Sequence, residues 1–518
     1  MIRRTRIVCT IGPSSSSPAV LRNLIQSGMD VARLNFSHGD PETHRRAAAD
    51  VRAAAQAVGR PIAIIGDLQG PKIRTGALDS SFLRLVRGRQ VVLTASHRQD
   101  PNEIEVSHGE LIESLRKGDR VLLDDGRIEL TVRSIAGGRA ACSVVRGGLL
   151  GERKGVSVPG RTPPLPALTD KDIIDLKLAV ELGVDYVALS FVRRPDDVLM
   201  CQQHLAGLNC TAPVIAKLEK VEAIRELNDI LDVAGAVMVA RGDLGVELRL
   251  GELPAVQKEV IDRANRAGVP VITATEMLES MVTSNRPTRA EASDVANAIW
   301  DGTDAVMLSQ ETSVGAHPVE AVRAMARICL SAQRHPTFQR QRQIWREPGQ
   351  VGSAIAHAAA ASADELGARV IIAFTESGTT ALRCSKARPH VPVIAASPNE
   401  EVLRRTSLYA GVVPLLVAQG RDTDEMFANA TEAAVRGGFV REGDRVVIVA
   451  GVPVGKPGQT NLLKVETVQG AARQTGDFAA GPSTVFGSCP GQPPPNRPAQ
   501  RRRRQAAPAS AMGPTPPR

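Results

Sequence analysis

Eight short apolar runs recur between residues 7 and 308, and a polar residue that could contact a phosphate, a carboxylate or a metal ion follows each of them. Runs this short and this rich in Val and Ile are typical of strands buried on both faces. Stretches with a helical pattern separate most of the runs, at 18–28, 41–58, 170–182, 196–206, 221–229, 252–267, 289–300 and 318–334. Alternating strands and helices predict a parallel sheet. Eight such units predict a closed (β/α)8 TIM barrel, an α/β fold whose active site lies at the carboxyl ends of the strands.

The chain changes character between the third and fourth runs. The third run ends at Asp67, whereas the fourth begins far along the chain. Alternating strand patterns and an Asp-Asp-Gly turn lie in between, and they predict a small all-β lid domain, at 73–160, inserted into one barrel loop. The remaining segments, 1–72 and 161–335, come close to the ~250 residues of a single barrel.

A second α/β unit is predicted after a polar linker at 336–350. Its strand-like runs are 370–374, 391–395, 412–416 and 445–449. Helical segments lie between these runs, so residues 351–470 are predicted to form a C-terminal domain with an open parallel sheet. Residues 471–518 are rich in Pro and Arg, a composition that predicts a disordered tail.

The charge of the chain does not indicate a nucleic-acid-binding protein. The net charge is +9, but residues 471–518 carry seven Arg and one Asp, or +6, so the other residues carry only +3. A folded part this close to neutral predicts no specific nucleic-acid partner.

Three features predict a cytoplasmic protein without a membrane segment. The seven cysteines are scattered and form no C-x-x-C pair, which indicates free thiols in a reducing compartment. The apolar stretch after the basic N-terminus stops at Gly12-Pro13, too early for a secretory signal. No apolar run approaches the ~20 residues of a membrane span.

The richest strand endings contain Lys217, Glu219 and Asp243. Lys217 and Glu219 are two residues apart on a strand, so their side chains point the same way. A carboxylate beside a cation suits a divalent metal held together with a phosphate, and Asp243 can add a second oxygen ligand. Gly242 allows the backbone to approach a ligand closely. The alternatives are a salt bridge at the barrel rim and an ordinary Asx turn.

Other strand endings add charge and hydroxyl groups. Arg33, Asn35 and Ser37 share one face of a strand, and Arg suits bidentate phosphate binding. The alternative is a helix cap beside a surface Arg. Asp67 is followed by a charged segment with a Gly-Pro hinge toward the lid. Thr275 offers a hydroxyl, although such a residue alone is more often a helix cap.

A hydroxyl-rich loop in the C-terminal domain could bind an effector. Its residues are Ser377, Gly378, Thr379 and Thr380. Hydroxyls and free N–H groups between a strand and a helix can bind phosphate. The loop lies outside the barrel, so its ligand is expected to be an effector; the alternative is a capped helix start.

These motifs resemble those of the pyruvate kinase family. The similar segments are 5–13, 31–39 (VARLNFSHG), 66–74 (GDLQGPKIR), 238–247 (MVARGDLGVE), 273–281 (TATEMLESM), 287–301 (PTRAEASDVANAIWD) and 308–312 (LSQET). They occur in order over about residues 5–470. The resemblance implies transfer of a phosphoryl group from phosphoenolpyruvate to ADP, which gives pyruvate and ATP. It also implies a homotetramer regulated by a phosphorylated metabolite.

The resemblance also implies roles for single residues. Glu219 and Asp243 would hold Mg²⁺ or Mn²⁺, and Lys217 would stabilise the migrating phosphoryl group. Arg33 would bind phosphate. Gly242, Asp243 and Thr275 would surround the substrate carboxylate, with Thr275 near the proton path. The residues implied to face the nucleotide are Asn35, His38, Arg74 and Lys154.

A monovalent cation assists many family members, but the sequence predicts that K⁺ is not required here. The site would be formed by Asn35, Ser37, Asp67 and the carbonyl of Leu68. Potassium-dependent members tend to carry Glu where this chain has Lys72, and an ammonium can supply the charge itself. The alternative is that Lys72 only forms a salt bridge with a neighbour.

Other departures from common family patterns are Thr43, Glu276 and Gln310, none of which belongs to the phosphoryl-transfer set. Two other functions stay open. The first is a different Mg²⁺-dependent barrel enzyme acting on phosphoenolpyruvate or an enolate, such as a carbon–carbon lyase. The second is a non-catalytic regulator on the same scaffold.

Overall fold

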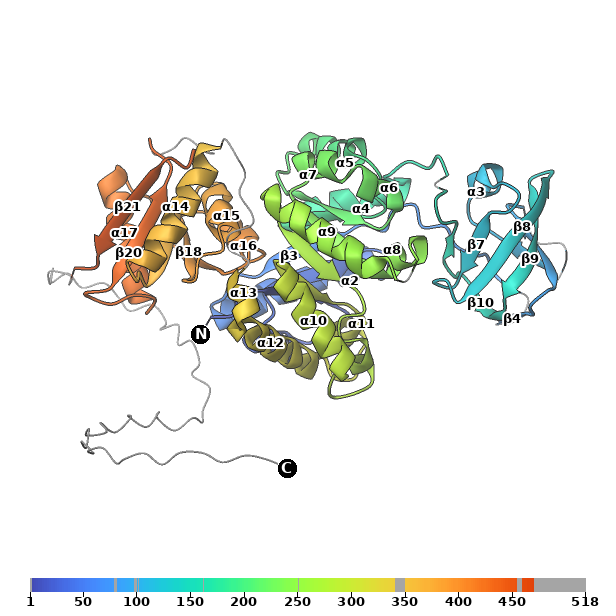
Figure 1. The fold of residues 1–518 in the computed structure, drawn as a ribbon, viewed down its shortest axis with the longest axis horizontal. Helices are drawn as coiled ribbons and strands as arrows, with labels where there is room; N and C mark the ends of the chain where they lie inside the picture. The colour runs from blue at the N-terminus through green and yellow to red at the C-terminus, as the bar shows by residue number, and fades with distance from the viewer. Residues whose placement is uncertain are drawn as a thin grey trace, which may run out of the picture. The chain divides into compact units, whose positions relative to one another are not determined.

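The fold is seen in a computed structural model (Figure 1). It describes residues 2–78, 82–96, 100, 102–161, 163–249, 251–340, 350–453 and 459–469. The predicted tail at 471–518 lies outside these residues. Within them, no helix is both long and apolar enough to cross a membrane.

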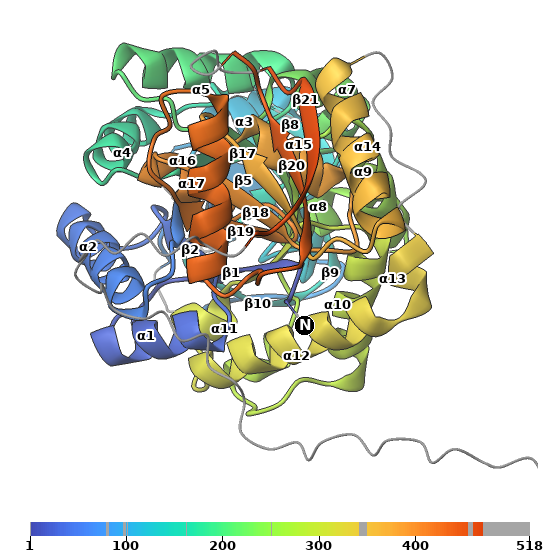
Figure 2. The ribbon, with the colours of Figure 1, turned by 90° about the vertical axis from the view of Figure 1, so that its left-hand side faces the viewer.

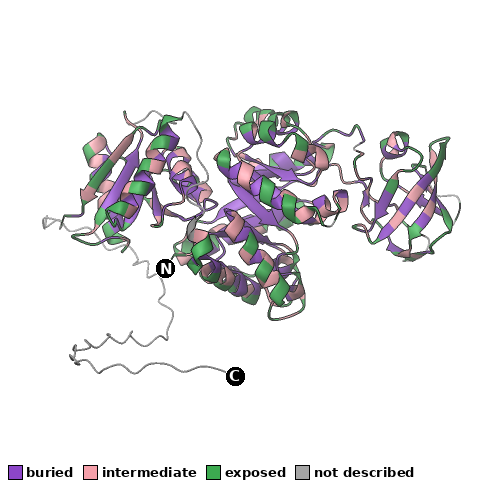
Figure 3. Ribbon diagram, in the orientation of Figure 1, coloured by how far each residue is buried: buried purple, intermediate pink, exposed green. Residues whose placement is uncertain are grey.

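Eight parallel strands close into a barrel in the order β1-β16-β15-β14-β13-β12-β3-β2. They are β1 (Arg6–Thr10), β2 (Val31–Asn35), β3 (Ala63–Asp67), β12 (Tyr186–Leu189), β13 (Val214–Leu218), β14 (Ala236–Ala240), β15 (Val271–Ala274) and β16 (Ala305–Leu308). Almost every strand residue is buried, whereas the surrounding helices are exposed on one side (Figure 3). The predicted (β/α)8 barrel is therefore confirmed.

The barrel helices begin where the sequence offers caps. They include α1 (Pro18–Ser27), α2 (Pro41–Val58), α4 (Asp170–Glu181), α5 (Pro195–Gly207), α9 (Leu253–Arg266), α10 (Arg289–Asp301) and α12 (Pro318–Arg334). Thr169 and Thr288 each form a capping box with the acidic residue three positions later. Several others carry Pro in the first turn, where its missing N–H costs nothing.

Some helices differ from the prediction. The stretch predicted as one helix at 221–229 forms α6 (Val221–Arg225) and α7 (Leu227–Val233), because Glu226 leaves the helical conformation at ψ 16°. The short helices α8 (Arg241–Glu247) and α11 (Gln310–Ser313) were not predicted. Two glycines within α8 lower its helix propensity, so its sequence resembles a loop.

Two β-sheets lie between Phe82 and Ser157. Their strands are β4 (Phe82–Leu85), β5 (Gln90–Thr94), β6 (Glu103–Glu105), β7 (Arg120–Leu123), β8 (Ile128–Ala136), β9 (Arg139–Arg146), β10 (Gly148–Gly151) and β11 (Val156–Ser157), with one helix, α3 (Gly109–Ser114). Gly137 and Gly138 both have positive φ and turn the β8–β9 hairpin. The segment has its own apolar core, as an inserted domain requires.

The C-terminal domain has a five-stranded sheet in the order β19-β18-β17-β20-β21. Its elements are α14 (Val351–Glu365), β17 (Val370–Phe374), α15 (Thr379–Lys386), β18 (Val393–Ser397), α16 (Glu400–Thr406), β19 (Val412–Leu416), α17 (Thr423–Arg436), β20 (Arg445–Ala450) and β21 (Leu462–Thr467). The first four strands are parallel, as predicted. The unpredicted β21 is antiparallel to β20 at the sheet edge. Its half-exposed residues lack a continuous apolar run.

Helices cover both faces of this sheet (Figure 2). Ile371 and Ala373 pack in one apolar cluster with residues of α14 and α15. Val370, Ile372 and Phe374 pack in another cluster with residues of α17. Successive β17 side chains thus alternate between two helical layers, which explains why every residue of this strand is apolar.

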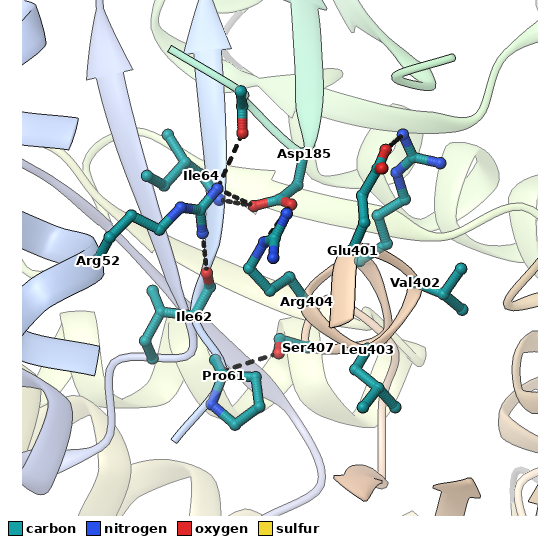
Figure 4. A network of polar contacts seen from close by, with 12 residues as sticks. Arg52, Pro61, Ile62, Ile64, Asp185, Glu401, Val402, Leu403, Arg404 and Ser407 are labelled. Carbon is teal, nitrogen blue, oxygen red and sulfur yellow. Dashed lines mark hydrogen bonds and ion pairs between the residues drawn. The ribbon is translucent and has the colours of Figure 1, made fainter. Parts of the chain in front are cut away.

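Buried carboxylates at the amino ends of the barrel strands connect the barrel to the C-terminal domain. Asp185, directly before β12, pairs with Arg52 of α2 at 2.8 Å and with Arg404 of α16 at 2.9 Å (Figure 4). The backbone N–H of Ile64 donates a third hydrogen bond to Asp185, 2.8 Å long. Asp304, directly before β16, likewise pairs with Lys386 at 2.6 Å. The amino ends of the barrel strands therefore stabilise the contact with the C-terminal domain. The carboxyl ends are where an active site is expected.

Candidate active site

The Lys217 ammonium lies at the carboxyl end of β13 between two acidic side chains. Its Nζ is 3.2 Å from Asp67 Oδ1 and 3.0 Å from Glu219 Oε1, and it donates a 2.7 Å hydrogen bond to Ser190 Oγ. Burial by itself lowers the pKa of Lys217, but the two carboxylates outweigh burial and raise it. Lys217 is therefore a fixed cation at the barrel mouth.

A second cation, Arg33 of β2, shares the same buried carboxylate. Arg33 Nε is 2.5 Å from Asp67 Oδ2, and its NH1 donates a 3.0 Å hydrogen bond to Thr10 Oγ1. Burial favours protonation of Asp67, but Arg33 and then Lys217 prevail and lower its pKa. Two cations balance the two carboxylates Asp67 and Glu219 here, and a divalent metal held by carboxylates would add the positive charge that suits a phosphate ligand.

Glu219 and Asp243 follow β13 and β14, which are neighbouring strands of the barrel. Burial raises the pKa of Glu219, and the charge of Asp243 adds to the rise although Lys217 opposes it. The two carboxylates are therefore close enough to repel one another, as they would be around a shared cation. The backbone N–H of Phe191, a residue with φ 55°, donates a 2.7 Å hydrogen bond to Glu219 Oε2 and orients it.

This donor set fits a Mg²⁺ or Mn²⁺ ion that takes further ligands from a substrate. Mg²⁺ is usually bound by one or two carboxylates together with phosphate oxygens and water. Among the residues that the structure describes, no cluster of three or more His, Cys, Asp or Glu could hold a metal by itself. The pair of carboxylates therefore needs phosphate oxygens or water to complete a coordination shell.

The four positions predicted for a monovalent cation lie at the ends of β2 and β3. Asn35 and Asp67 are register partners on these strands. Asn35 Oδ1 accepts a 3.3 Å hydrogen bond from the N–H of Ser37, and the carbonyl of Leu68 accepts one of 2.7 Å from Ser190 Oγ. Within the described residues, Asp67 Oδ1 is buried and forms an ion pair with the Lys217 ammonium at 3.2 Å that lacks hydrogen-bond geometry. This oxygen keeps capacity for a cation beside the Lys217 ammonium.

Lys72 lies beside Asp243 in the structure. Its Nζ is 3.1 Å from Asp243 Oδ1, so it forms the kind of salt bridge that the alternative interpretation expects. Lys72 and Asp243 line one cavity with Phe191 of the barrel and with Asp125 and Gly155 of the inserted domain. The ion pair thus lies in the cleft between barrel and lid.

Thr275 follows β15 in a left-handed backbone conformation, with φ 67°. Its hydroxyl accepts a 2.8 Å hydrogen bond from the N–H of Gly242 and donates one of 2.6 Å to the carbonyl of Ala274. The predicted substrate-binding residues Gly242 and Thr275 are therefore in direct contact. Both donors are used within the protein, and Gly242 directly precedes the proposed metal ligand Asp243 in the chain.

Comparison with known proteins agrees with this geometry. Residues 2–322 match the model of the pyruvate kinase barrel domain, and residues 353–466 match that of the pyruvate kinase alpha/beta domain. The chain is 45% identical over 475 residues to the pyruvate kinase of Geobacillus stearothermophilus, covering 90% of this chain and 81% of that protein. It is 43% identical over 476 residues to that of Sporosarcina psychrophila, with the same coverage of 90% and 81%.

The chain belongs to the pyruvate kinase family.

The family resemblance predicted that four residues face a nucleotide, and the structure places Asn35 and His38 at the end of β2, Arg74 at the lid junction and Lys154 on the inserted domain. The pKa of His38 is lowered by partial burial and by the nearby cations Arg74, Arg33 and Lys72. Arg74 donates a 3.1 Å hydrogen bond to the carbonyl of Arg153 at the lid junction.

Lys154 and Asn35 lie on different domains. Lys154 pairs with Asp124 at 3.0 Å, so its ammonium is held by the lid. Asn35 ends β2 at the barrel mouth. Motion of the lid would change the distance between Lys154 and the two residues at the end of β2.

The structure separates the four residues of the predicted effector loop. Ser377 is exposed and its hydroxyl lies 3.0 Å from that of Thr379. Gly378 has φ 91°, a conformation that favours glycine. Thr380 is buried, and its hydroxyl lies 3.0 Å from that of Thr460, which lies two residues before β21. Ser377 and Thr379 are therefore the accessible hydroxyls of the loop.

Two residues of the site received no role from the sequence. Ser190 directly follows β12, but its contact with Lys217 depends on the pairing of β12 with β13. Arg241 stands within the quoted MVARGDLGVE segment, yet nothing in that segment indicates that its side chain turns inward and becomes buried.

Proposed function

We propose that this chain transfers a phosphoryl group from phosphoenolpyruvate to ADP and releases pyruvate and ATP. The observation that supports this most is the Lys217 ammonium, which lies within 3.2 Å of both Asp67 and Glu219 at the barrel mouth. Phosphoryl transfer needs positioning and charge neutralisation more than covalent help. A fixed cation beside a pair of metal-suited carboxylates provides both.

Each residue has a distinct task in this proposal. Lys217 neutralises charge on the phosphoryl group while the bond to the enol oxygen breaks and the bond to the ADP oxygen forms. Arg33 binds the phosphate before transfer. Gly242 and Thr275 orient the substrate carboxylate. A Mg²⁺ or Mn²⁺ held by Glu219 and Asp243 would neutralise the phosphate oxygens when bound.

The second half of the reaction is a proton transfer. Loss of the phosphoryl group leaves the enolate of pyruvate, and its methylene carbon must gain a proton to form the methyl group. The hydroxyl of Thr275 is proposed to lie on the path of that proton. Water outside the cleft returns the proton to the path.

The nucleotide would bind between the barrel mouth and the inserted domain. Asn35, His38, Arg74 and Lys154 are proposed to face it, and closure of the lid would exclude water from the reacting phosphate. Activity is proposed not to require K⁺. A phosphorylated metabolite at Ser377–Thr380, a homotetramer and a cytoplasmic location stay predictions from the sequence.

An assay of pyruvate formation tests the proposal. The full chain is supplied with phosphoenolpyruvate, ADP and Mg²⁺, and each is then left out in turn. Formation of one pyruvate and one ATP only in the complete mixture is expected. A lyase would not require ADP and a non-catalytic regulator would show no turnover, so either result would reject the proposal.

A further inference from the structure

Two successive residues after β15 adopt a backbone conformation that non-glycine residues rarely take. Thr275 has φ 67° and Glu276 has φ 52°. A side chain with a Cβ is disfavoured there, so the surrounding structure must hold both residues in place. One of them is the residue proposed to lie on the proton path.

The buried side chain of Arg241 holds this turn through hydrogen bonds to its backbone carbonyls. Its Nε donates 3.2 Å hydrogen bonds to the carbonyls of Ala274 and Thr275, and its NH2 donates to those of Thr275 at 2.7 Å and Glu276 at 3.2 Å. Only 8% of Arg241 is exposed. One guanidinium thus contacts three consecutive carbonyls, an arrangement that its rigid planar donors permit and a Lys ammonium does not.

The other edge of the guanidinium is anchored to two helices. Its NH1 lies 2.6 Å from Asp294 Oδ2 of α10 and donates a 3.4 Å hydrogen bond to Gln257 Oε1 of α9. The Asp294 side chain is 40% exposed, so it can be changed with little disturbance of the core. Asp294 supplies the negative charge that a buried guanidinium needs.

These contacts are linked to the Thr275 hydroxyl through one shared carbonyl. The carbonyl of Ala274 accepts hydrogen bonds both from Arg241 Nε and from the Thr275 hydroxyl. The hydroxyl in turn accepts the N–H of Gly242, the residue that follows Arg241. Movement of the guanidinium would therefore shift the hydroxyl and its acceptor together.

We propose that Arg241 is a positioning residue for the proton-transfer half of the reaction. It keeps the Thr275 hydroxyl where the enolate carbon can receive its proton. The proposal rests on the proposed function, because it requires Thr275 to act on that proton. Lys217 and Glu219 are held by other partners, so the phosphoryl-transfer half should depend less on Arg241.

The two halves can be measured separately on the full-length enzyme. Exchange of the methyl hydrogens of pyruvate with D2O, followed by NMR with Mg²⁺ and ATP present, reports the proton step. ATP formation in a single turnover, followed by rapid quench with phosphoenolpyruvate and ADP, reports phosphoryl transfer. The variants are Arg241→Lys and Asp294→Asn. Asp301→Asn is the matched control, since Asp301 lies on the same helix and pairs with Lys258.

Small displacements of a positioned group can cost on the order of 10²-fold in rate. Arg241→Lys is expected to slow proton exchange by about 10²-fold and ATP formation by less than about tenfold. Asp294→Asn should slow exchange by about tenfold, because the guanidinium keeps its carbonyl contacts but loses one anchor. Asp301→Asn should match the wild type. If Arg241→Lys does not fold, Asp294→Asn carries the test alone.

Thr275→Val separates the two ways in which the proposal can fail. If this variant loses exchange while Arg241→Lys and Asp294→Asn keep it, Arg241 is not a positioning residue. Equal slowing of exchange and ATP formation in the Asp294 variant would also overturn the proposal, because it would indicate a general structural role. If Thr275→Val itself keeps exchange, the role of Thr275 in the proposed function fails and the Arg241 proposal fails with it.

Discussion

The ammonium of Lys72 lies 3.1 Å from Asp243 Oδ1, so a residue of the segment that leads into the lid neutralises a proposed metal ligand. Lys72 and a divalent metal would compete for the same carboxylate. Metal binding would then release the ammonium, and the structure indicates a link between metal binding and the segment that carries the lid.

Replacement of Lys72 with Gln is expected to tighten metal binding to the free enzyme. The paired side chains are 27% and 33% exposed, so screening limits the pair to at most about 1 kcal/mol. This corresponds to at most about fivefold in affinity. Titration with Mn²⁺ followed by electron paramagnetic resonance measures the change. Lys258→Gln, which removes an ion pair between the exposed Lys258 and the largely buried Asp301 far from this pair in the chain, is the control. Unchanged or weaker binding by the Lys72 variant would rule out competition.

Replacement of Lys72 with Glu is expected to make activity depend on K⁺. A carboxylate would add negative charge beside Asp243, which a bound monovalent cation would have to offset. Initial rates are compared in a tetraalkylammonium buffer with and without K⁺. The wild type should be active in both, and the variant only with K⁺. Strong K⁺ activation of the wild type would end the charge-replacement hypothesis.

Metal affinity is expected to fall as the pH is lowered. Burial and Asp243 raise the pKa of Glu219 above its ordinary value of 4.5, so protons compete with the metal at a higher pH than for an exposed Glu. In the metal-free fold, Glu219 contributes most to folding stability at a pH below its ordinary pKa. That contribution is lost as the pH rises through its raised pKa. Mn²⁺ titrations between about pH 5 and pH 8 test the effect. Glu219→Gln should bind weakly without this pH dependence, and a wild-type affinity constant over the range would contradict the prediction.

Replacement of Asp185 with Asn is expected to destabilise the fold. The fully buried carboxylate pairs with Arg52 and Arg404, and breaking such a group costs about 3–5 kcal/mol. Urea unfolding measures the change. Glu181→Gln is the control, because Glu181 pairs with Arg45 at the surface and its loss should leave the unfolding midpoint in place. A midpoint for Asp185→Asn that also stays in place would show that this network does not hold the domains together.

Much of the barrel could be predicted because its strands are short, apolar and separated by helices with clear caps. Lys217 and Glu219 follow one such strand, and strand periodicity alone places them on one side. The contacts of Arg241 could not be predicted, because they depend on how α8 turns the side chain beneath the loop after β15. The partner of Lys72 could not be predicted either, since it depends on the path of the chain between barrel and lid. The edge strand β21 was missed because half-exposed strands lack the apolar run that identifies the others.

The kinetic effect of Lys217→Ala tests the central claim most directly. Lys217 is proposed to act on the phosphoryl group in flight, so its loss should lower kcat more than it weakens substrate binding. The measurement is the steady-state rate of pyruvate formation with phosphoenolpyruvate, ADP and Mg²⁺. Lys258→Ala is the control for loss of an ion-paired lysine, and thermal unfolding confirms that both variants are folded. A fall in kcat of about 10²-fold or more, with a nearly unchanged KM for phosphoenolpyruvate, is expected for Lys217→Ala. A folded Lys217→Ala enzyme with near-normal kcat would contradict the account.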